Sequence, residues 1–306
     1  MLTSSGISVQ NLCADFLANR STSLGFIVLL GPTAAGKTAL SIELAKKFGG
    51  EIISADSRQV YISMDIGTDK IPVERREGIP HYLFDLALPS ERFTVADFKK
   101  LAEERIEAIL ARGRVPFVVG GTGLYIRAIT ENFSLPPENP ELRKKLHDEL
   151  AKFGSAALHE KLAKLDPQSA AKIHPQNARY IIRALEIIMT TGKPKNDASG
   201  RPRWRVLKIG LNPTREILFE RIHQRVEKQF ERGLIEETKK LLAMGYSKEL
   251  PAMSSLGYRE VMEYIEGKLS LEDTKELLKQ NTRNFAKRQM VWFKRDKGVV
   301  WIDAMS

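Results

Sequence analysis

The stretch GFIVLLGPTAAGKT, residues 25–38, decides the fold of this chain. Its apolar half is typical of a short strand that ends at Gly31, and a helix-like stretch follows from Ala39 to Phe48. The residues between them match GxxxxGK[ST], a motif whose glycines let backbone N–H groups curl around a diphosphate. The N-terminus of the following helix adds a positive dipole for the same anion. The stretch therefore predicts a strand, a phosphate-binding loop and a helix, in that order.

We expect the eight residues of this phosphate loop to hold a pyrophosphate-bearing ligand: Gly31, Pro32, Thr33, Ala34, Ala35, Gly36, Lys37 and Thr38. Lys37 can reach the terminal phosphate, and the hydroxyl of Thr38 can ligate Mg²⁺, the expected cofactor. A glycine-rich turn that binds nothing is the alternative, which the complete motif between a strand and a helix disfavours. The motif does not name the rest of the ligand, so nucleotide binding, including ATP binding, is compatible with it.

Other apolar runs follow this stretch along the sequence. Strands are predicted at 51–56, 115–121, 205–211 and 299–303, and helical periodicity covers 94–112. Strands that alternate with helices are typical of a parallel sheet covered by helices. The predicted fold class is therefore α/β, a P-loop NTPase-like parallel sheet flanked by helices, with an all-helical insertion domain.

Two turn-rich segments set the predicted domain boundaries. SLPPENP at 134–140 ends the strand–helix alternation, residues 141–191 look wholly helical, and GKPKNDASGRP at 192–202 is a second break. We expect an α/β core in two parts, 24–138 and 203–306, around a helical insertion at 139–202. Residues 1–23 are expected to form a disordered tail.

Composition excludes several classes of protein. Of 306 residues, 42% are hydrophobic and 28% charged, which is ordinary globular usage and rules out disorder and fibrous repeats. The single cysteine, Cys13, excludes disulfides within the chain and cysteine-based zinc sites. No apolar run approaches the ~18 residues of a membrane span, and no signal peptide is visible. We expect a cytoplasmic protein with no membrane partner.

The positive charge is confined to one part of the chain. Residues 1–138 hold 15 basic and 16 acidic residues, whereas 139–306 hold 33 basic and 22 acidic ones. Such a surplus suggests a polyanionic partner such as nucleic acid, although a basic surface that merely keeps the protein soluble is equally compatible. Within 277–295, four basic residues form a stripe at helical spacing: Lys279, Arg283, Lys287 and Lys294. The interleaved Phe285, Trp292 and Phe293 are expected to be core residues rather than base-stacking ones.

An acidic residue stands beside the predicted phosphate loop. An ATPase holds Mg²⁺ with an acid that ends an apolar strand, but the strand at 115–121 runs into Gly120, Gly121 and Thr122 instead. Asp56 follows the strand at 51–56, which places it at the carboxyl edge of the sheet, where α/β proteins bind ligands. A turn or helix-cap aspartate is the alternative interpretation.

Five motifs carry a resemblance to a known family: GPTAAGKT, DSRQVYISMDIGT (56–68), GGTGLY (120–125), SSLGYRE (254–260) and AKRQMVWFKR (286–295). In this order and spacing, over most of 25–303, the chain resembles the tRNA dimethylallyltransferase (IPP transferase) family in its bacterial form. The resemblance implies that the phosphate loop binds dimethylallyl diphosphate rather than ATP. It also implies that the prenyl group goes to N6 of adenosine 37, next to the anticodon, in tRNAs that read codons starting with U. The helical insertion would then clamp the anticodon arm.

The resemblance also assigns roles to residues. It implies that Asp56 accepts the N6 proton and that Arg225 holds the pyrophosphate; Arg221, one turn earlier, is the other candidate, and a solvated helix face is the alternative for this segment. Thr122, on a glycine-flanked turn, is expected to fix the amine by hydrogen bonding, with a purely structural turn residue as the alternative. The implied tRNA contacts are Asp56, Ser57, Arg58, Gln59, Thr122, Arg143, Arg179, Tyr180, Ile181, Ile182, Arg183, Ser254, Ser255, Leu256, Gly257, Tyr258, Arg259, Lys287, Arg288, Gln289, Met290, Val291, Trp292, Phe293 and Lys294. Tyr180 replaces a polar or basic residue usual in the family, and Ile71 separates Lys70 from Pro72. The expected enzyme is a monomer without the zinc finger of eukaryotic members.

Three other functions compete at this point. A P-loop small-molecule or nucleotide kinase also uses GxxxxGK[ST] and a nearby aspartate, but it does not require the basic surplus. A non-catalytic, GTPase-like RNA-binding switch needs an NKxD motif, which the sequence lacks. A prenyltransferase that acts on free AMP is a closer rival, against which the insertion and AKRQMVWFKR argue.

Overall fold

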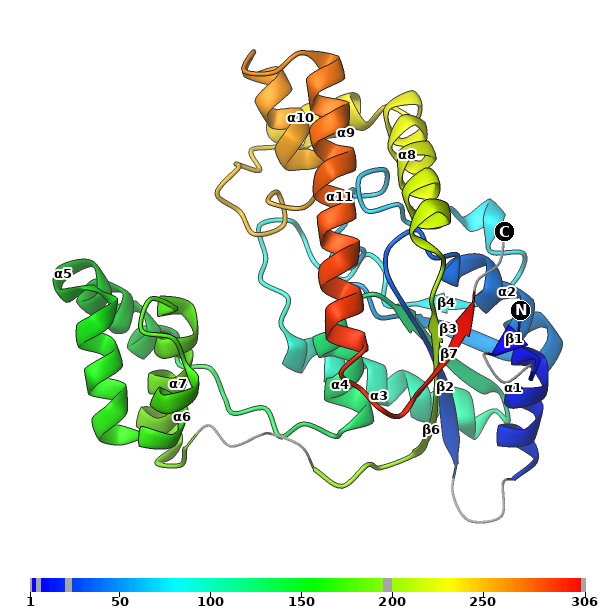
Figure 1. Cartoon of the computed structure of the whole chain (residues 1–306), viewed down its shortest axis with the longest axis horizontal. Helices are drawn as coiled ribbons and strands as arrows, with labels where there is room; N and C mark the ends of the chain where they lie inside the picture. The colour runs from blue at the N-terminus through cyan, green and yellow to red at the C-terminus, as the bar shows by residue number, and fades with distance from the viewer. Residues whose placement is uncertain (1, 4–6, 20–23, 195–199, 304–306) are drawn as a thin grey trace. The chain divides into compact units, whose positions relative to one another are not determined.

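The computed structural model describes residues 2–3, 7–19, 24–194 and 200–303, which form two compact units (Figure 1). Unit 1 comprises residues 1–130 and 202–306, and unit 2 comprises residues 131–201. Unit 2 begins before the predicted insertion boundary at residue 139. The reason is that residues 131–139 bond within unit 2: the Arg183 guanidinium donates to the Pro136 carbonyl, and the Asn139 N–H donates to Glu186.

A mixed sheet forms the centre of unit 1. Its seven described strands lie in the order β1-β7-β6-β2-β5-β3-β4. All neighbours pair in parallel except β1 and β7, which are antiparallel. The strands are β1 Leu2–Thr3, β2 Gly25–Leu30, β3 Gly50–Ser54, β4 His81–Tyr82, β5 Val115–Gly120, β6 Arg205–Leu211 and β7 Val299–Asp303. The predicted α/β fold with a parallel sheet is therefore confirmed.

Helices bury both faces of this sheet. Along β2, Ile27 and Leu29 face one hydrophobic cluster, and Phe26, Val28 and Leu30 face another. This explains why the strand is a continuous apolar run rather than an alternating one. Helices α1 (Val9–Ala18) and α2 (Lys37–Phe48) supply the first cluster, and α3 (Val95–Ala111) and α4 (Gly123–Thr130) supply the second.

The predicted disordered tail at residues 1–23 is wrong for residues 7–19. Ser8 caps α1 by accepting the Asn11 N–H, and Val9 and Cys13 are buried against the sheet. Cys13 thus serves as a small hydrophobic residue, and burial raises the pKa of its thiol to about 12. Val9, Cys13 and Phe16 share one helical face, and this short apolar stripe was the available sequence signal.

Four further helices of unit 1 gather on one side of the sheet (Figure 1). They are α8 Arg215–Glu231, α9 Leu234–Ala243, α10 Tyr258–Ile265 and α11 Leu271–Phe293. Together with residues 60–64 of the loop after β3, they bury a third cluster. That loop also holds the short 3₁₀ helix η1, Val73–Arg75. Ile222 of α8 and Ala286 of α11 pack together, with Ala34 of the phosphate loop against them.

Unit 2 is a small helical domain. It consists of α5 Pro140–Leu165, α6 Pro167–Lys172 and α7 Ala178–Thr191. Leu146, Leu158 and Leu162 of α5 pack against Ile181 and Leu185 of α7. Gly154 has φ 78° and ψ 172°, so α5 is two helical segments joined at a kink rather than one continuous helix. In the described part of the chain, no helix is both long and apolar enough to cross a membrane.

Candidate active site

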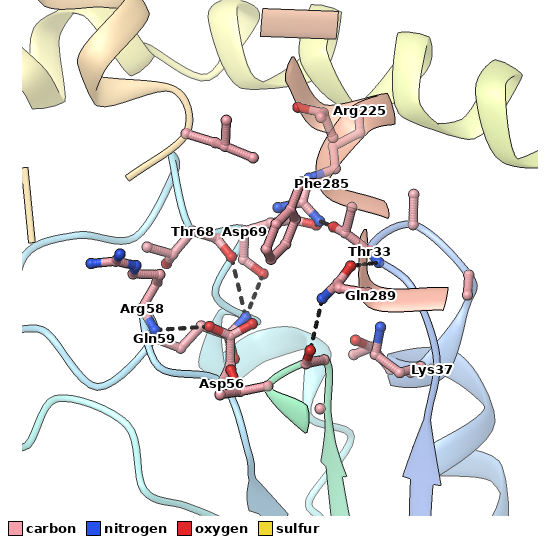
Figure 2. A pocket seen from close by; sticks show the side chains of 18 of the residues that line it. Thr33, Lys37, Asp56, Arg58, Gln59, Thr68, Asp69, Arg225, Phe285 and Gln289 are labelled. Carbon is pink, nitrogen blue, oxygen red and sulfur yellow. Dashed lines mark hydrogen bonds and ion pairs between the residues drawn. The ribbon is translucent and has the colours of Figure 1, made fainter. Parts of the chain in front are cut away.

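A cavity of about 850 Å³ opens in unit 1 at the carboxyl ends of β2, β3 and β5 (Figure 2). The phosphate loop, residues 56–59 and residues 120–122 line it from the sheet, and α8 and α11 line it from the other side. Because neighbouring parallel strands end at the same edge, three segments that are distant in the sequence meet here.

The phosphate loop joins β2 to α2. Gly36 has φ 92°, a left-handed conformation that glycine adopts without steric cost, and α2 begins directly after it. The Lys37 ammonium donates to the carbonyls of Gly31 at 3.0 Å and Pro32 at 2.6 Å. Burial lowers the pKa of Lys37 to about 8; the Asp56 carboxylate opposes this shift and the Arg225 guanidinium adds to it. The loop therefore combines a helix N-terminus with a lysine that loses its charge at a lower pH than an exposed lysine does.

Two arginines of α8 reach the phosphate loop. Arg225 donates to the Thr33 hydroxyl at 2.8 Å and forms an ion pair with Asp69 at 3.3 Å. Arg221, one turn earlier, donates to the Ala35 carbonyl at 3.4 Å. The structure thus brings both candidate arginines to the loop, with the shorter contact from Arg225.

Asp56 and Thr122 follow adjacent strands, β3 and β5. One oxygen of Asp56, Oδ1, accepts the Arg58 N–H at 2.8 Å, and among the described residues no hydrogen bond engages Oδ2. The Thr122 hydroxyl accepts the Ser57 N–H at 3.0 Å and donates to the Ser57 hydroxyl at 3.3 Å. The loop after β3 therefore orients both predicted catalytic side chains, and Asp56 keeps one oxygen for a substrate.

Glu237 of α9 fixes the loop at residues 65–69. Its carboxylate accepts the N–H groups of Asp65, Ile66 and Gly67 at 2.9–3.1 Å, and the Tyr258 hydroxyl donates to it at 2.6 Å. Burial, followed by the charge of Glu237, raises the pKa of Tyr258. Nothing in the sequence marked Glu237, because an acid on a helix is an ordinary surface residue.

Two other residues missed by the sequence analysis support the same loop. The buried Lys70 ammonium donates to the carboxylates of Asp65 and Asp85, both at 2.6 Å. Gln229 of α8 donates to the carbonyls of Ile66 and Gly67. Gln59, predicted as a tRNA contact, lines the cavity and donates to the carbonyls of Thr68 and Asp69 (Figure 2). The loop is therefore held by side chains of α8 and α9 and by residues at its own ends.

Gln289 of α11 spans two walls of the cavity (Figure 2). Its side-chain oxygen accepts the Thr33 N–H at 2.8 Å, and its amide nitrogen donates to the Gly121 carbonyl at 2.9 Å. Gln289 is 7% exposed. Both ends of the amide are engaged inside the protein, and because Gln289 also lines the cavity, its predicted tRNA contact stays a prediction.

The remaining predicted contacts on α11 divide into exposed and buried residues. Lys287, Arg288, Val291, Trp292 and Lys294 are exposed, and Met290 is half-buried. Phe293 is 3% exposed in the core, so its predicted tRNA contact is wrong.

The predicted roles of neighbouring residues on α11 change in the same way. Of the three aromatics expected in the core, Phe293 is buried, whereas Phe285 and Trp292 are both more than a third exposed. Lys279 does not contribute to the predicted basic stripe, because its ammonium forms ion pairs with Glu227 and Glu276, each at 2.7 Å. Arg283 donates to the imidazole of His223.

The segment before α10 shows a similar division. Ser254 and Arg259 are exposed, and Arg259 pairs with Glu260 at 2.8 Å. Ser255, Gly257 and Tyr258 are buried, and Leu256 is half-buried. The predicted tRNA contact of Tyr258 is wrong, because the side chain is fully buried and its hydroxyl donates to Glu237. Ser255 donates to the Ala252 carbonyl but lines the cavity, so its predicted contact stays a prediction.

In unit 2, two of the arginines predicted to bind tRNA form ion pairs with a buried carboxylate. Glu186 accepts hydrogen bonds from Arg143 at 2.6 Å and from Arg183 at 2.8 Å. Ile181 and Ile182 are at most 3% exposed, so their predicted tRNA contacts are wrong. Arg143 and Arg183 therefore stabilise the fold of unit 2. Of the residues predicted here to contact tRNA, Arg179 and Tyr180 are exposed on its surface.

Few protein side chains are available to coordinate a metal ion at this site. In the described ranges, no group of three or more His, Cys, Asp or Glu side chains is arranged to hold a metal ion. Mg²⁺ needs no such cluster, since one or two protein oxygens suffice when substrate phosphates and water supply the rest. Thr38 is exposed at the start of α2 and lines the same cavity as Asp56, so the residues fit a phosphate-bound Mg²⁺.

Comparisons with known proteins agree on one family. A family model described as IPP transferase matches residues 59–296. The chain is 47% identical to the tRNA dimethylallyltransferase of Thermomicrobium roseum, over 90% of this chain and 85% of that protein. It is also 47% identical to the tRNA dimethylallyltransferase of Carboxydothermus hydrogenoformans, over 91% of each.

Solved structures support the same relationship. The tRNA isopentenylpyrophosphate transferase of Bacillus halodurans aligns with a TM-score of 0.69 and 44% identity, over 92% of this chain and 90% of that one. A eukaryotic dimethylallyltransferase that acts on tRNA aligns with a TM-score of 0.81 and 32% identity, over 93% and 75%. Because the family model covers most of the sequence and these relatives align over nine-tenths of it, the chain belongs to the IPP transferase family.

Proposed function

We propose that this chain transfers the dimethylallyl group of dimethylallyl diphosphate to N6 of adenosine 37, next to the anticodon, in tRNAs that read codons starting with U. The observation that carries this proposal is that the phosphate loop, Asp56 and Thr122 line one cavity. A diphosphate donor and an amine acceptor need such a pair of sites side by side. Membership of the IPP transferase family supports the choice of tRNA as the acceptor.

The phosphate loop would stabilise the departing pyrophosphate. Backbone N–H groups at the start of α2 would bind its charge, and Lys37 and Arg225, which line the same cavity, would add positive charge. Thr38 would hold Mg²⁺, which when bound would neutralise part of the charge on the leaving group. Because the donor's C1–O bond breaks as pyrophosphate leaves, groups that bind the product charge lower the barrier.

The acceptor side needs a base. The exocyclic N6 amine of adenine is a poor nucleophile, since its lone pair is delocalised into the ring. As N6 bonds to C1 of the dimethylallyl group, its proton would pass to Oδ2 of Asp56, the oxygen that forms no hydrogen bond among the described residues. Thr122, held by Ser57, would orient the amine. The atoms balance: one C–O bond breaks, one C–N bond forms, and the proton ends on the carboxylate.

The acceptor base has to leave its stack to reach the cavity. Extrusion is inexpensive in an unpaired loop such as the anticodon loop. Lys287, Arg288 and Trp292 are exposed on α11, and Arg288 also lines the cavity, which supports assigning them to phosphates and bases of the tRNA. Arg179 and Tyr180 would contact the anticodon arm from unit 2. We further propose that the enzyme acts as a monomer in the cytoplasm.

Labelling would test this function. The protein is incubated with dimethylallyl diphosphate carrying a labelled prenyl group and with either tRNA or AMP, in the presence of Mg²⁺. We expect label in tRNA and none in AMP. Label in AMP would indicate the free-nucleotide prenyltransferase instead, and ATP hydrolysis at kinase rates without any prenyl transfer would refute the proposed chemistry.

A further inference from the structure

We infer that Gln289 is a positioning residue that sets the distance between the phosphate loop and the Thr122 turn, and thereby between the electrophile and its nucleophile. The inference rests on the proposed function. Gln289 is nearly buried and bridges Thr33 and Gly121, with donor–acceptor distances of 2.8 and 2.9 Å (Figure 2). These partners lie 256 and 168 residues away in the sequence, so one side chain joins three distant segments.

The glycines of the GGTG turn show how closely the turn and α11 approach. A Cβ atom on Gly121 would lie 2.3 Å from the amide nitrogen of Gln289. A Cβ atom on Gly123 would lie 2.2 Å from the indole of Trp292, one helical turn further along α11. Neither glycine has a positive φ, so close approach to the helix, not backbone conformation, explains both of them.

Amide chemistry is required at this position. The Thr33 N–H can only donate and the Gly121 carbonyl can only accept, so the bridging group needs one acceptor and one donor at its two ends. A glutamine side chain provides both, whereas a carboxylate provides only acceptors and a methionine provides neither in useful strength. The bond to the Gly121 carbonyl is buried and the bond to the Thr33 N–H is partly buried, so losing the first would leave a buried carbonyl unsatisfied.

The bridge has a direct consequence for group transfer. The loop that contains Thr33 would hold the leaving pyrophosphate, and the turn that contains Gly121 carries Thr122, which would hold the amine. The reacting atoms have to be about 3–3.5 Å apart before reaction, and a misplacement of ~1 Å costs on the order of 100-fold in rate. A side chain that fixes the spacing between the two walls therefore acts on the rate of transfer more than on the binding of either substrate.

Two substitutions test this role. Gln289→Met keeps the length of the side chain and removes both hydrogen bonds, and Gln289→Glu keeps the acceptor for Thr33 and removes the donor for Gly121. Gln280→Met and Gln280→Glu are matched controls, since Gln280 lies exposed on the same helix. The measurements are the single-turnover rate at saturating dimethylallyl diphosphate and tRNA, the dissociation constant of each substrate, and the thermal midpoint, which verifies folding.

We expect Gln289→Met to lower the single-turnover rate by roughly 100-fold, with both dissociation constants changed by less than about threefold. For Gln289→Glu, the rate relative to the unsubstituted enzyme should rise as the pH falls from 8 to 5.5. A protonated carboxyl group has an O–H donor and a carbonyl acceptor, so it can rebuild both bonds, and a ratio of rates cancels the pH effects that the two enzymes share.

Either of two results would overturn the inference. The first is a single-turnover rate for Gln289→Met within threefold of the unsubstituted enzyme. The second is a relative rate for Gln289→Glu that is lowered but does not change with pH. Failure of the proposed function looks different, because the unsubstituted enzyme would then label no tRNA at all.

Discussion

Asp56 and Lys37 line the same cavity, and we propose that the first accepts a proton and the second binds the diphosphate. Lys37 is held by two loop carbonyls, and burial brings its pKa down to about 8. Asp56 keeps one carboxylate oxygen free of hydrogen bonds among the described residues. Under the proposed function, donor affinity depends on Lys37 and the rate of proton removal depends on Asp56, so substitutions should separate the two.

Asp56→Asn tests the base. The amide keeps the shape of the side chain and can still bond to the amine, but it cannot accept the N6 proton. We expect the single-turnover rate to fall by roughly 10²–10⁴-fold, a loss of about 3–5 kcal/mol of transition-state stabilisation, with donor affinity nearly unchanged. A near-normal rate would make Asp56 a turn residue, and loss of donor binding would make it part of a metal site.

Lys37 gives donor binding a predictable pH dependence. A bound diphosphate favours the charged ammonium, so affinity for dimethylallyl diphosphate should be constant below pH 8. Above pH 8 it should fall by up to about tenfold per pH unit, because the free enzyme loses that charge first. Calorimetric titrations from pH 7 to 9.5 measure this dependence. Lys37→Ala should bind the donor weakly with no such pH dependence, while its tRNA affinity stays intact; an unchanged profile in Lys37→Ala would assign the titration to another group.

At the scale of elements, strands and the phosphate loop could be predicted, whereas the direction of side chains could not. β2, β6 and β7 have the predicted bounds, since apolar runs between turn residues carry a clear pattern. In α11, by contrast, the motif marks Gln289, Trp292 and Phe293 alike, although the first and last face inward. A motif identifies a functional segment, but the packing of the helix determines which of its residues are exposed to solvent. α1 was missed because ten residues with a short apolar stripe give little pattern to detect.

The loop after β3 owes its conformation to Glu237 of α9. Glu237→Ala would leave three backbone N–H groups without their acceptor, at about 1–3 kcal/mol for each one that water cannot reach. We expect lower stability in urea unfolding and a slower transfer rate, since Asp56 and Thr122 are oriented by the same loop. Glu236→Ala is the control: Glu236 is exposed in the first turn of α9, and its loss should cost only about 0.3–1 kcal/mol. Equal stability of the two variants would contradict the anchoring role.

At the scale of the whole molecule, we propose that unit 1 holds both reacting groups and that unit 2 adds contacts to the tRNA. Unit 1 contains the cavity, and unit 2 has its own core, with Arg143 and Arg183 bound to Glu186 inside it. Unit 2 can therefore be removed without opening the core of unit 1, and its contribution to tRNA binding can be measured separately.

Replacing residues 131–201 with a short Gly/Ser linker should abolish tRNA binding and leave dimethylallyl diphosphate binding intact. In the full-length protein, tRNA affinity should fall steeply as salt rises, because bound phosphates release counterions. Filter binding at several salt concentrations measures both effects. A truncated protein that still binds tRNA tightly, or a flat salt response, would refute a phosphate-tracking role for unit 2.

The order of strands also matters while the chain is being synthesised. β2, which carries the phosphate loop, lies between β5 and β6, and β6 begins at Arg205, after all of unit 2. A nascent chain that has just completed α4 therefore has an unpaired edge on its central strand, a ready template for wrong pairing. The ribosome has to deliver another eighty or so residues before that edge is covered, and unit 2, whose contacts are local, can fold during this interval. Slow codons within unit 2 would lengthen the exposure of β2, whereas slow codons read after β6 has left the ribosome would not.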